Sequence, residues 1–120
     1  MVSWRPRPTI ASPSTKPVQN DSGHNTIIEL VERALEIGAD QLDIEYNGGV
    51  EEVAAFQGNV GVGIANLEAS SREAEALREQ LYALARKGRT VVVKGVRYRL
   101  RASEYDSFGE TAYRVSITPI

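Results

Sequence analysis

The chain has 120 residues, of which 42% are hydrophobic and 25% are charged, a composition typical of one soluble globular domain. It contains no cysteine, which excludes disulfides and thiolate metal sites. No apolar run approaches the ~20 residues of a membrane-spanning helix. We therefore expect a cytoplasmic protein without membrane insertion.

The first 25 residues differ in composition from the rest of the chain. They are rich in proline, serine, threonine and asparagine, and their large apolar groups are few, Trp4 and Ile10 among them. Such a segment cannot bury enough apolar surface to offset the entropy lost on ordering. The sequence therefore predicts a disordered tail over residues 1–25 and a single domain over residues 26–120.

An amphipathic helix is predicted from residue 26. Thr26 and Glu29 have the spacing of a capping box, in which each side chain binds the backbone N–H of the other residue. Gly38 can adopt the left-handed conformation that ends a helix. Between them, apolar residues recur at helical spacing and form one stripe: Ile27, Leu30, Val31, Ala34 and Leu35.

Three strands are predicted after this helix. In the first, Leu42, Ile44 and Tyr46 alternate with polar residues, as in a strand with one buried face. Asn-Gly-Gly at residues 47–49 favours a turn into a second strand over residues 50–56. Gln-Gly-Asn at residues 57–59 favours another turn, into a third strand that places Val60, Val62 and Ile64 on one face.

The second half repeats this layout. Ser70 and Glu73 form another possible capping box, before a helix at about residues 71–87 that Gly88 ends. Strands are predicted over residues 90–94, 96–102 and 112–118, with a tight turn at Lys94-Gly95 and a loop over residues 104–109. The predicted order is α-β-β-β-α-β-β-β. Because short turns join successive strands, we expect an α+β fold with two helices packed on one face of an antiparallel sheet.

Charge is distributed unevenly along the chain. Acids far outnumber bases from Glu29 to Glu79, whereas residues 80–103 contain seven bases and no acid. One interpretation is that the two stretches attract each other within the fold. The other is a basic face for an anionic partner. Its candidate residues are four arginines that alternate with apolar residues on neighbouring strands and can grip phosphates in pairs of hydrogen bonds: Arg97, Arg99, Arg101 and Arg114.

No catalytic group, metal ligand or cofactor site is predicted. Asp43 and Glu45 lie on one strand face, where alternation with core residues predicts exposure and cross-strand pairing with arginines. The glycines Gly58, Gly61 and Gly63 lack the spacing of a nucleotide-binding loop. The only histidine, His24, falls in the predicted tail. We therefore expect a protein that is not an enzyme.

Two segments suggest a family. Residues 34–46, ALEIGADQLDIEY, resemble the beginning of the N-terminal PAS-like domain of type II secretion and type IV pilus ATPases. Residues 98–117, YRLRASEYDSFGETAYRVSI, are similar to its later strands, with Arg101 and Arg114 at the places of its arginines. Asp43 stands where that family has histidine, and the RecA-like motor is not part of this sequence. The resemblance implies a fold and an assembly or adaptor role, not an ATPase.

Two functions follow from these observations. The first is a small non-enzymatic interaction or adaptor module that binds another protein or itself, with the predicted tail, which carries RPRP and Trp4, as a docking segment. The alternative is binding of phosphate, a nucleotide or RNA through the arginine face. Against the alternative, Tyr98 is predicted to point into the core, so that no aromatic platform for bases lies beside the arginines.

Overall fold

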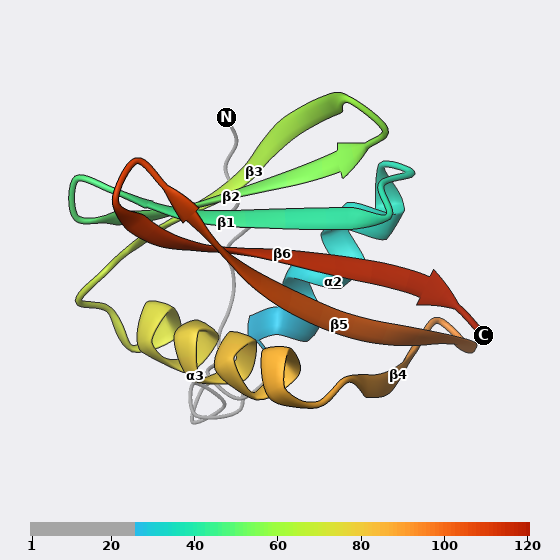
Figure 1. The fold of residues 1–120 in the computed structure, drawn as a ribbon. Helices are drawn as coiled ribbons and strands as arrows, with labels where there is room; N and C mark the ends of the chain where they lie inside the picture. The colour runs from blue at the N-terminus through green and yellow to red at the C-terminus, as the bar shows by residue number, and fades with distance from the viewer. Residues whose placement is uncertain (1–25) are drawn as a thin grey trace, which may run out of the picture.

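The computed structural model describes residues 26–120, so that the tail predicted over residues 1–25 lies outside the described residues. These residues form two helices and six strands in the predicted order, and Figure 1 shows their arrangement. They are α2 (Thr26–Glu36), β1 (Gln41–Asn47), β2 (Val50–Gln57), β3 (Val60–Glu68), α3 (Arg72–Arg86), β4 (Arg89–Val93), β5 (Val96–Ser107) and β6 (Glu110–Pro119).

All six strands form one sheet, in the order β3-β2-β1-β6-β5-β4, and every neighbouring pair is antiparallel. The sheet thus consists of two three-stranded meanders that meet at its centre. There β1 and β6, the first and last strands of residues 26–120, pair from Gln41 opposite Ser116 to Glu45 opposite Ala112. The predicted α+β fold with an antiparallel sheet is confirmed.

Both helices cover the same face of the sheet. In Figure 1, α2 lies behind β1 and β6, and α3 runs along the lower side of the molecule. Their apolar stripes and the inward-facing strand residues form one core, because burial of apolar surface contributes most of the stability of a domain this small. The fully buried large side chains are Ile27, Leu30, Leu42, Ile44, Leu77, Leu81, Leu100, Val31, Val53 and Val115.

Tight turns set the register of the hairpins. Both central residues have positive φ in the turns Gly48-Gly49, Lys94-Gly95 and Phe108-Gly109, as a type I′ turn requires. In the turn between β2 and β3 only Gly58 has positive φ, as in a type II′ turn. Two-residue turns of these kinds match the twist of paired strands, and each of them therefore fixes the register of its hairpin.

The predicted loop over residues 104–109 is wrong. Strand β5 continues to Ser107, and only Phe108 and Gly109 form the turn. The polar residues of this segment, EYDS, suggested a loop, but they pair with β6 from Glu104 opposite Tyr113 to Ser107 opposite Glu110, which satisfies the backbone groups of Tyr105 and Ser107. This extension brings Tyr105 onto the sheet.

Strand β3 does not keep a simple alternation throughout, although Val60 and Val62 share a face as predicted and Ile64 packs against the core. A bulge shifts the β2–β3 register between Val53 opposite Ala65 and Ala54 opposite Gly63, so that Ile64 has no partner of its own. The buried residues of β3 are consequently Ala65 and Leu67, whereas Val60 and Val62 are exposed.

The ends of α3 differ from the prediction by small shifts. Ser71, not Ser70, caps the helix, since its hydroxyl accepts a hydrogen bond from the Ala74 N–H at 3.1 Å. At the other end Lys87 leaves the helix in an extended conformation. Gly88 therefore does not end α3 with a positive φ. Gly38, by contrast, has φ +80° after α2, as predicted.

Candidate functional site

The face of the sheet opposite the helices, which we call the open face, carries all four candidate arginines. Residues opposite each other in a ladder share a face, and the ladders place Asp43 opposite Arg114 and Arg114 opposite Ser103. Alternation along β5 then puts Arg101, Arg99 and Arg97 on the same face as Ser103. The predicted grouping on one face is confirmed, whereas binding at these residues stays a prediction.

Arg114 is held by a carboxylate on the neighbouring strand. Its Nε donates to Asp43 Oδ1 at 3.3 Å, and its Nη2 donates to Asp43 Oδ2 at 3.4 Å. This two-point contact matches the planar guanidinium to the planar carboxylate. The predicted cross-strand pairing of Asp43 with an arginine is therefore confirmed. The charge of Arg114 is already paired within the fold, unlike the charges of the other three arginines.

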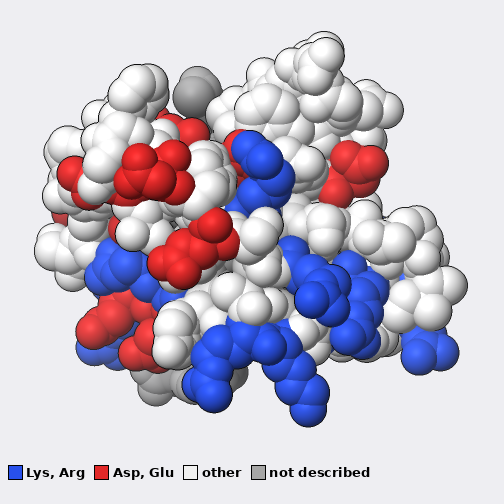
Figure 2. Space-filling model, in the orientation of Figure 1, with Lys and Arg blue, Asp and Glu red and all other residues white. Residues whose placement is uncertain are grey.

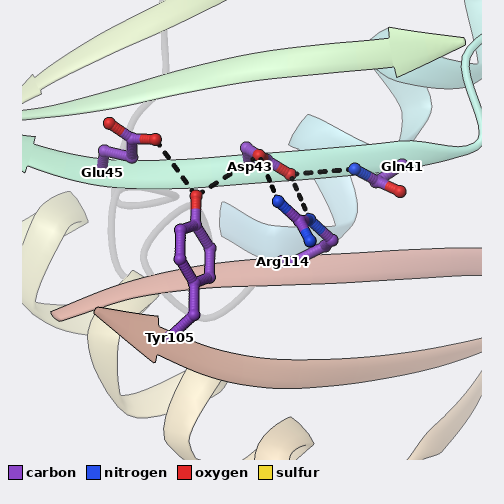
Figure 3. A network of polar contacts seen from close by, with 5 residues as sticks. All are labelled: Gln41, Asp43, Glu45, Tyr105 and Arg114. Carbon is purple, nitrogen blue, oxygen red and sulfur yellow. Dashed lines mark hydrogen bonds and ion pairs between the residues drawn. The ribbon is translucent and has the colours of Figure 1, made fainter. Parts of the chain in front are cut away.

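Tyr105 completes this group, as Figure 3 shows. Its hydroxyl lies 3.1 Å from Glu45 Oε2 and 3.4 Å from Asp43 Oδ2, and its ring stacks on the Arg114 guanidinium at 4.8 Å. Gln41 donates from Nε2 to Asp43 Oδ1 at 3.1 Å. We call these five residues the central network: Gln41, Asp43, Glu45, Tyr105 and Arg114.

The exposure predicted for Asp43 is wrong. The residue is only 9% exposed, and Glu45 beside it is half-buried. The sequence places Asp43 on the face away from the core, but the side chains of Arg114 and Tyr105 lie over it from β6 and β5. Burial of this carboxylate is tolerable because three side chains donate hydrogen bonds to it.

The central network shifts the ionisation of its members. Burial raises the pKa of Tyr105 to about 12, and the charge of Asp43 and the hydrogen bond to Glu45 act in the same direction. The hydrogen bond to Asp43, followed by its charge, raises the pKa of Arg114. Tyr105 therefore remains a neutral donor and Arg114 a cation throughout the physiological range.

The other three arginines have no such partner. We call Arg97, Arg99 and Arg101 the arginine row; all three are exposed, and none forms an ion pair with a residue in the described range 26–120. In Figure 2 the lower right of the view holds basic side chains without acidic ones between them, whereas acidic side chains lie mainly toward the left and the top.

Gly88 fits beside the arginine row. A Cβ at this position would lie 3.0 Å from Cγ of Arg101 and 3.2 Å from Nε of Arg99. It would also lie 3.0 Å from the Leu100 carbonyl oxygen, so the glycine lets the segment that joins α3 to β4 lie close to β5. This close approach, and not a positive φ, favours glycine here.

Attraction between the acidic and basic stretches of the sequence accounts for little of this arrangement. Within the described part of the chain, Lys94 is the only base of residues 80–103 with an ion pair, to Glu36 at 3.8 Å. Both side chains of this pair are largely exposed. An exposed pair at this distance contributes less than about 1 kcal/mol. Most of the basic stretch remains turned toward solvent.

The prediction that no aromatic residue shares the arginines' face is wrong. Tyr105 lies on this face opposite Ala112, and Phe56 lies on it opposite Gln41. Each ring, however, is covered on one side. Tyr105 stacks on Arg114, and the Phe56 ring packs across Gly61, where a Cβ would come within 2.5 Å of it.

A hollow of about 530 Å³ on the helix side was not foreseen from the sequence. Glu51, 6% exposed, accepts a hydrogen bond from Arg78 Nη1 at 3.1 Å, and the same nitrogen donates to the Ala69 carbonyl. With Arg78 and Glu51 paired in this way, the remaining charges of the wall are those of Glu104 and Glu110. The lining residues are Tyr46, Glu51, Ala69, Arg78, Leu81, Glu104, Glu110, Thr111 and Tyr113.

Within residues 26–120 no group of histidine and carboxylate side chains is arranged to hold a metal ion. No helix in the same range is long and apolar enough to cross a bilayer.

Comparison with other proteins adds no family to these observations. No protein-family model matches the chain, and no curated protein gives a significant match. The resemblance to the N-terminal PAS-like domain of secretion ATPases therefore stays a prediction.

Proposed function

We propose that this chain is a small non-enzymatic module that binds another protein through the arginine row on its open face. The observation that carries the proposal is the contrast between neighbours on one surface. The carboxylates of β1 on this face, Asp43 and Glu45, are engaged by Arg114 and Tyr105, and the row itself has no ion-pair partner among residues 26–120. Acidic side chains of a partner would supply the missing counter-charges.

Protein is favoured over nucleic acid by the state of the aromatic residues. Single-stranded RNA is held by basic groups together with aromatic rings on which bases stack. Here the two rings on the open face each have one side covered, Tyr105 by Arg114 and Phe56 by the backbone of β3 at Gly61. The guanidinium groups alone could still hold phosphates, which keeps binding of phosphate, a nucleotide or RNA as the second candidate.

The arginine row by itself gives only weak affinity. Exposed ion pairs contribute about 0.2–1 kcal/mol each, so that three of them supply at most about 3 kcal/mol. A dissociation constant of 1 mM already corresponds to about 4 kcal/mol. A partner that binds usefully must therefore make further contacts beside the row.

The proposal can be tested by affinity capture with two matched variants. R97Q/R99Q removes two charges from the row, and R86Q/K87Q removes the same number from the exposed end of α3. From a nuclease-treated extract, we expect a protein that is retained by the wild type and by R86Q/K87Q but lost from R97Q/R99Q. Equal retention by all three forms would refute the proposal.

Salt dependence and nuclease treatment distinguish the second candidate, binding of phosphate, a nucleotide or RNA, from protein binding. Binding to phosphates releases counterions and weakens steeply as salt rises. If nuclease treatment abolishes capture, and an NMR titration with a short RNA or with ATP moves the amides of Arg97, Arg99 and Arg101 at low salt only, the chain is a phosphate binder. That result would replace the protein-binding proposal.

A further inference from the structure

The arginine row lies one strand away from an unpaired edge of the sheet. Strand β4 pairs with β5 on one side, and no described residue pairs with it on the other. Thr90 is opposite Arg99 and Val92 is opposite Arg97, so that these two short side chains lie on the open face between the row and the edge. Val92 is 62% exposed.

The ladder shows which backbone groups of β4 point outward. A two-residue turn closes with a hydrogen-bonded pair, here Val93 and Val96, and bonded and non-bonded pairs then alternate along the hairpin. Val92 and Thr90 therefore belong to non-bonded pairs. In agreement, the carbonyl of Arg97, opposite Val92, turns away from β4 and accepts a hydrogen bond from the Ile120 N–H at 3.1 Å. The free edge thus offers the N–H and C=O of Thr90 and Val92.

We propose that an extended acidic segment of a partner protein adds to β4 as a seventh strand, with its carboxylates on the open face against the arginine row. This inference rests on the proposed function and specifies its partner. The backbone of the segment would pair with Thr90 and Val92. Its open-face side chains would stand two strand spacings, about 10 Å, from Arg97 and Arg99. Glutamate and arginine can meet over that distance across Thr90 and Val92.

Charge favours an acidic segment over a second copy of the chain. The edge is flanked by Arg89 and Lys94 as well as by the row, so that two β4 edges would bring like charges together. The strand at the opposite end of the sheet, β3, is bent by the bulge at Ile64 and carries none of these bases. An acidic segment that adds to β4 would therefore pair with a regular edge strand and lie beside bases of opposite charge.

The test uses the full chain and a blocked peptide in which glutamate alternates with threonine. Amide hydrogen exchange followed by NMR should slow at Thr90 and Val92 when the peptide is added. A peptide with glutamine in place of each glutamate should bind at least ~5-fold more weakly, because it forms no ion pairs with the row. Equal binding of the two peptides would contradict the acidic partner.

Backbone pairing is tested by V92P with V92T as its matched control. Proline removes the outward N–H without breaking a bond to β5, and an edge strand tolerates it at such a position. We expect V92P to weaken peptide binding ~5-fold or more, the effect of losing a backbone hydrogen bond, and V92T to bind as the wild type does. If V92P does not fold, the exchange of the two wild-type amides decides the question alone.

The remaining outcomes separate this inference from the proposed function. Peptide binding that shifts the arginine row but leaves exchange at Thr90 and Val92 unchanged would overturn strand addition and leave the proposed function standing. Protection of these amides that rises with protein concentration without peptide would identify a second copy as the occupant, against the inference. Binding of a short uridine oligonucleotide in place of the peptide would overturn both.

Discussion

The central network and the arginine row are two groups of charged side chains on one face of one sheet, and they differ in what surrounds them. On β6, Arg114 has a carboxylate opposite it and an aromatic ring stacked on it. On β5, Arg99 has Thr90 on one side and Thr118 on the other. The same residue type is therefore part of the fold at the centre of the sheet and free for a partner near its edge. Position in the sheet, not residue type, makes the difference.

The largest loss of stability is expected when the buried carboxylate of the central network is removed. D43A leaves the Arg114 guanidinium and the Gln41 amide without their shared acceptor, while the Tyr105 hydroxyl keeps its bond to Glu45, and we expect a loss of about 2 kcal/mol in the free energy of unfolding. Chemical denaturation measures it as a lower midpoint with an unchanged slope. E45A is the control and should cost less than half as much, since Glu45 accepts one bond from Tyr105. Equal losses for both variants would contradict a central role of Asp43.

The ion pair between Asp43 and Arg114 is expected to contribute less to the free energy of unfolding than D43A removes. A double-mutant cycle of D43N and R114Q should give a coupling free energy of about 1 kcal/mol, because Arg114 is half exposed and can regain water. The same cycle with D43N and R99Q should give a coupling near zero. A coupling of similar size in both cycles would show that the field of the basic surface, and not the contact, holds Asp43.

Tyr105 offers a test by pH. Its pKa of about 12 in the folded protein lies above the ordinary value of 10.0 that the unfolded chain has, so that its contribution is fully present below pH 10 and is lost as pH rises toward 12. Y105F removes the hydroxyl at a cost of about 0.5–1 kcal/mol. The stability difference between wild type and Y105F should therefore shrink across this range. A constant difference would show that the hydroxyl ionises at its ordinary pKa.

The smallest expected effect on stability belongs to the arginine row. R99Q should change the free energy of unfolding by less than about 0.5 kcal/mol, because Arg99 is exposed and has no ion-pair partner in the described range. Thermal or chemical denaturation beside R114Q checks this, and R114Q should cost more. If R99Q proves the more destabilising, the row serves the fold and the contrast between the two groups is lost.

Local sequence patterns were sufficient for most of the fold. Apolar stripes with a period near 3.6 located both helices, and glycine-containing turns located three of the four hairpins. The fourth, at Phe108-Gly109, was obscured because the polar run Glu104–Ser107 resembles a loop. Residues on the sheet face that no helix covers do not need to be apolar. A pattern based on core burial therefore cannot detect where such a strand ends.

The candidate site was only partly accessible to sequence reasoning. Alternation along β5 and β6 placed four arginines on one face, and all four lie there. The burial of Asp43 could not be foreseen, because it depends on β5 being long enough to carry Tyr105 over the centre of the sheet. A signal was present in the alternation of Ser103, Tyr105 and Ser107, which continues the period of the arginines.

The sequence by itself determined the order of helices and strands, the antiparallel pairing within each meander and the shared face of the four arginines, because these depend on residues close together in the chain. Only the tertiary structure decided that β6 pairs with β1 and that Arg114 meets Asp43, residues that lie 71 positions apart. Such a contact requires the whole chain to close its core first, since neither strand carries a local preference for the other. That closure engages one arginine and leaves three facing solvent beside a free edge.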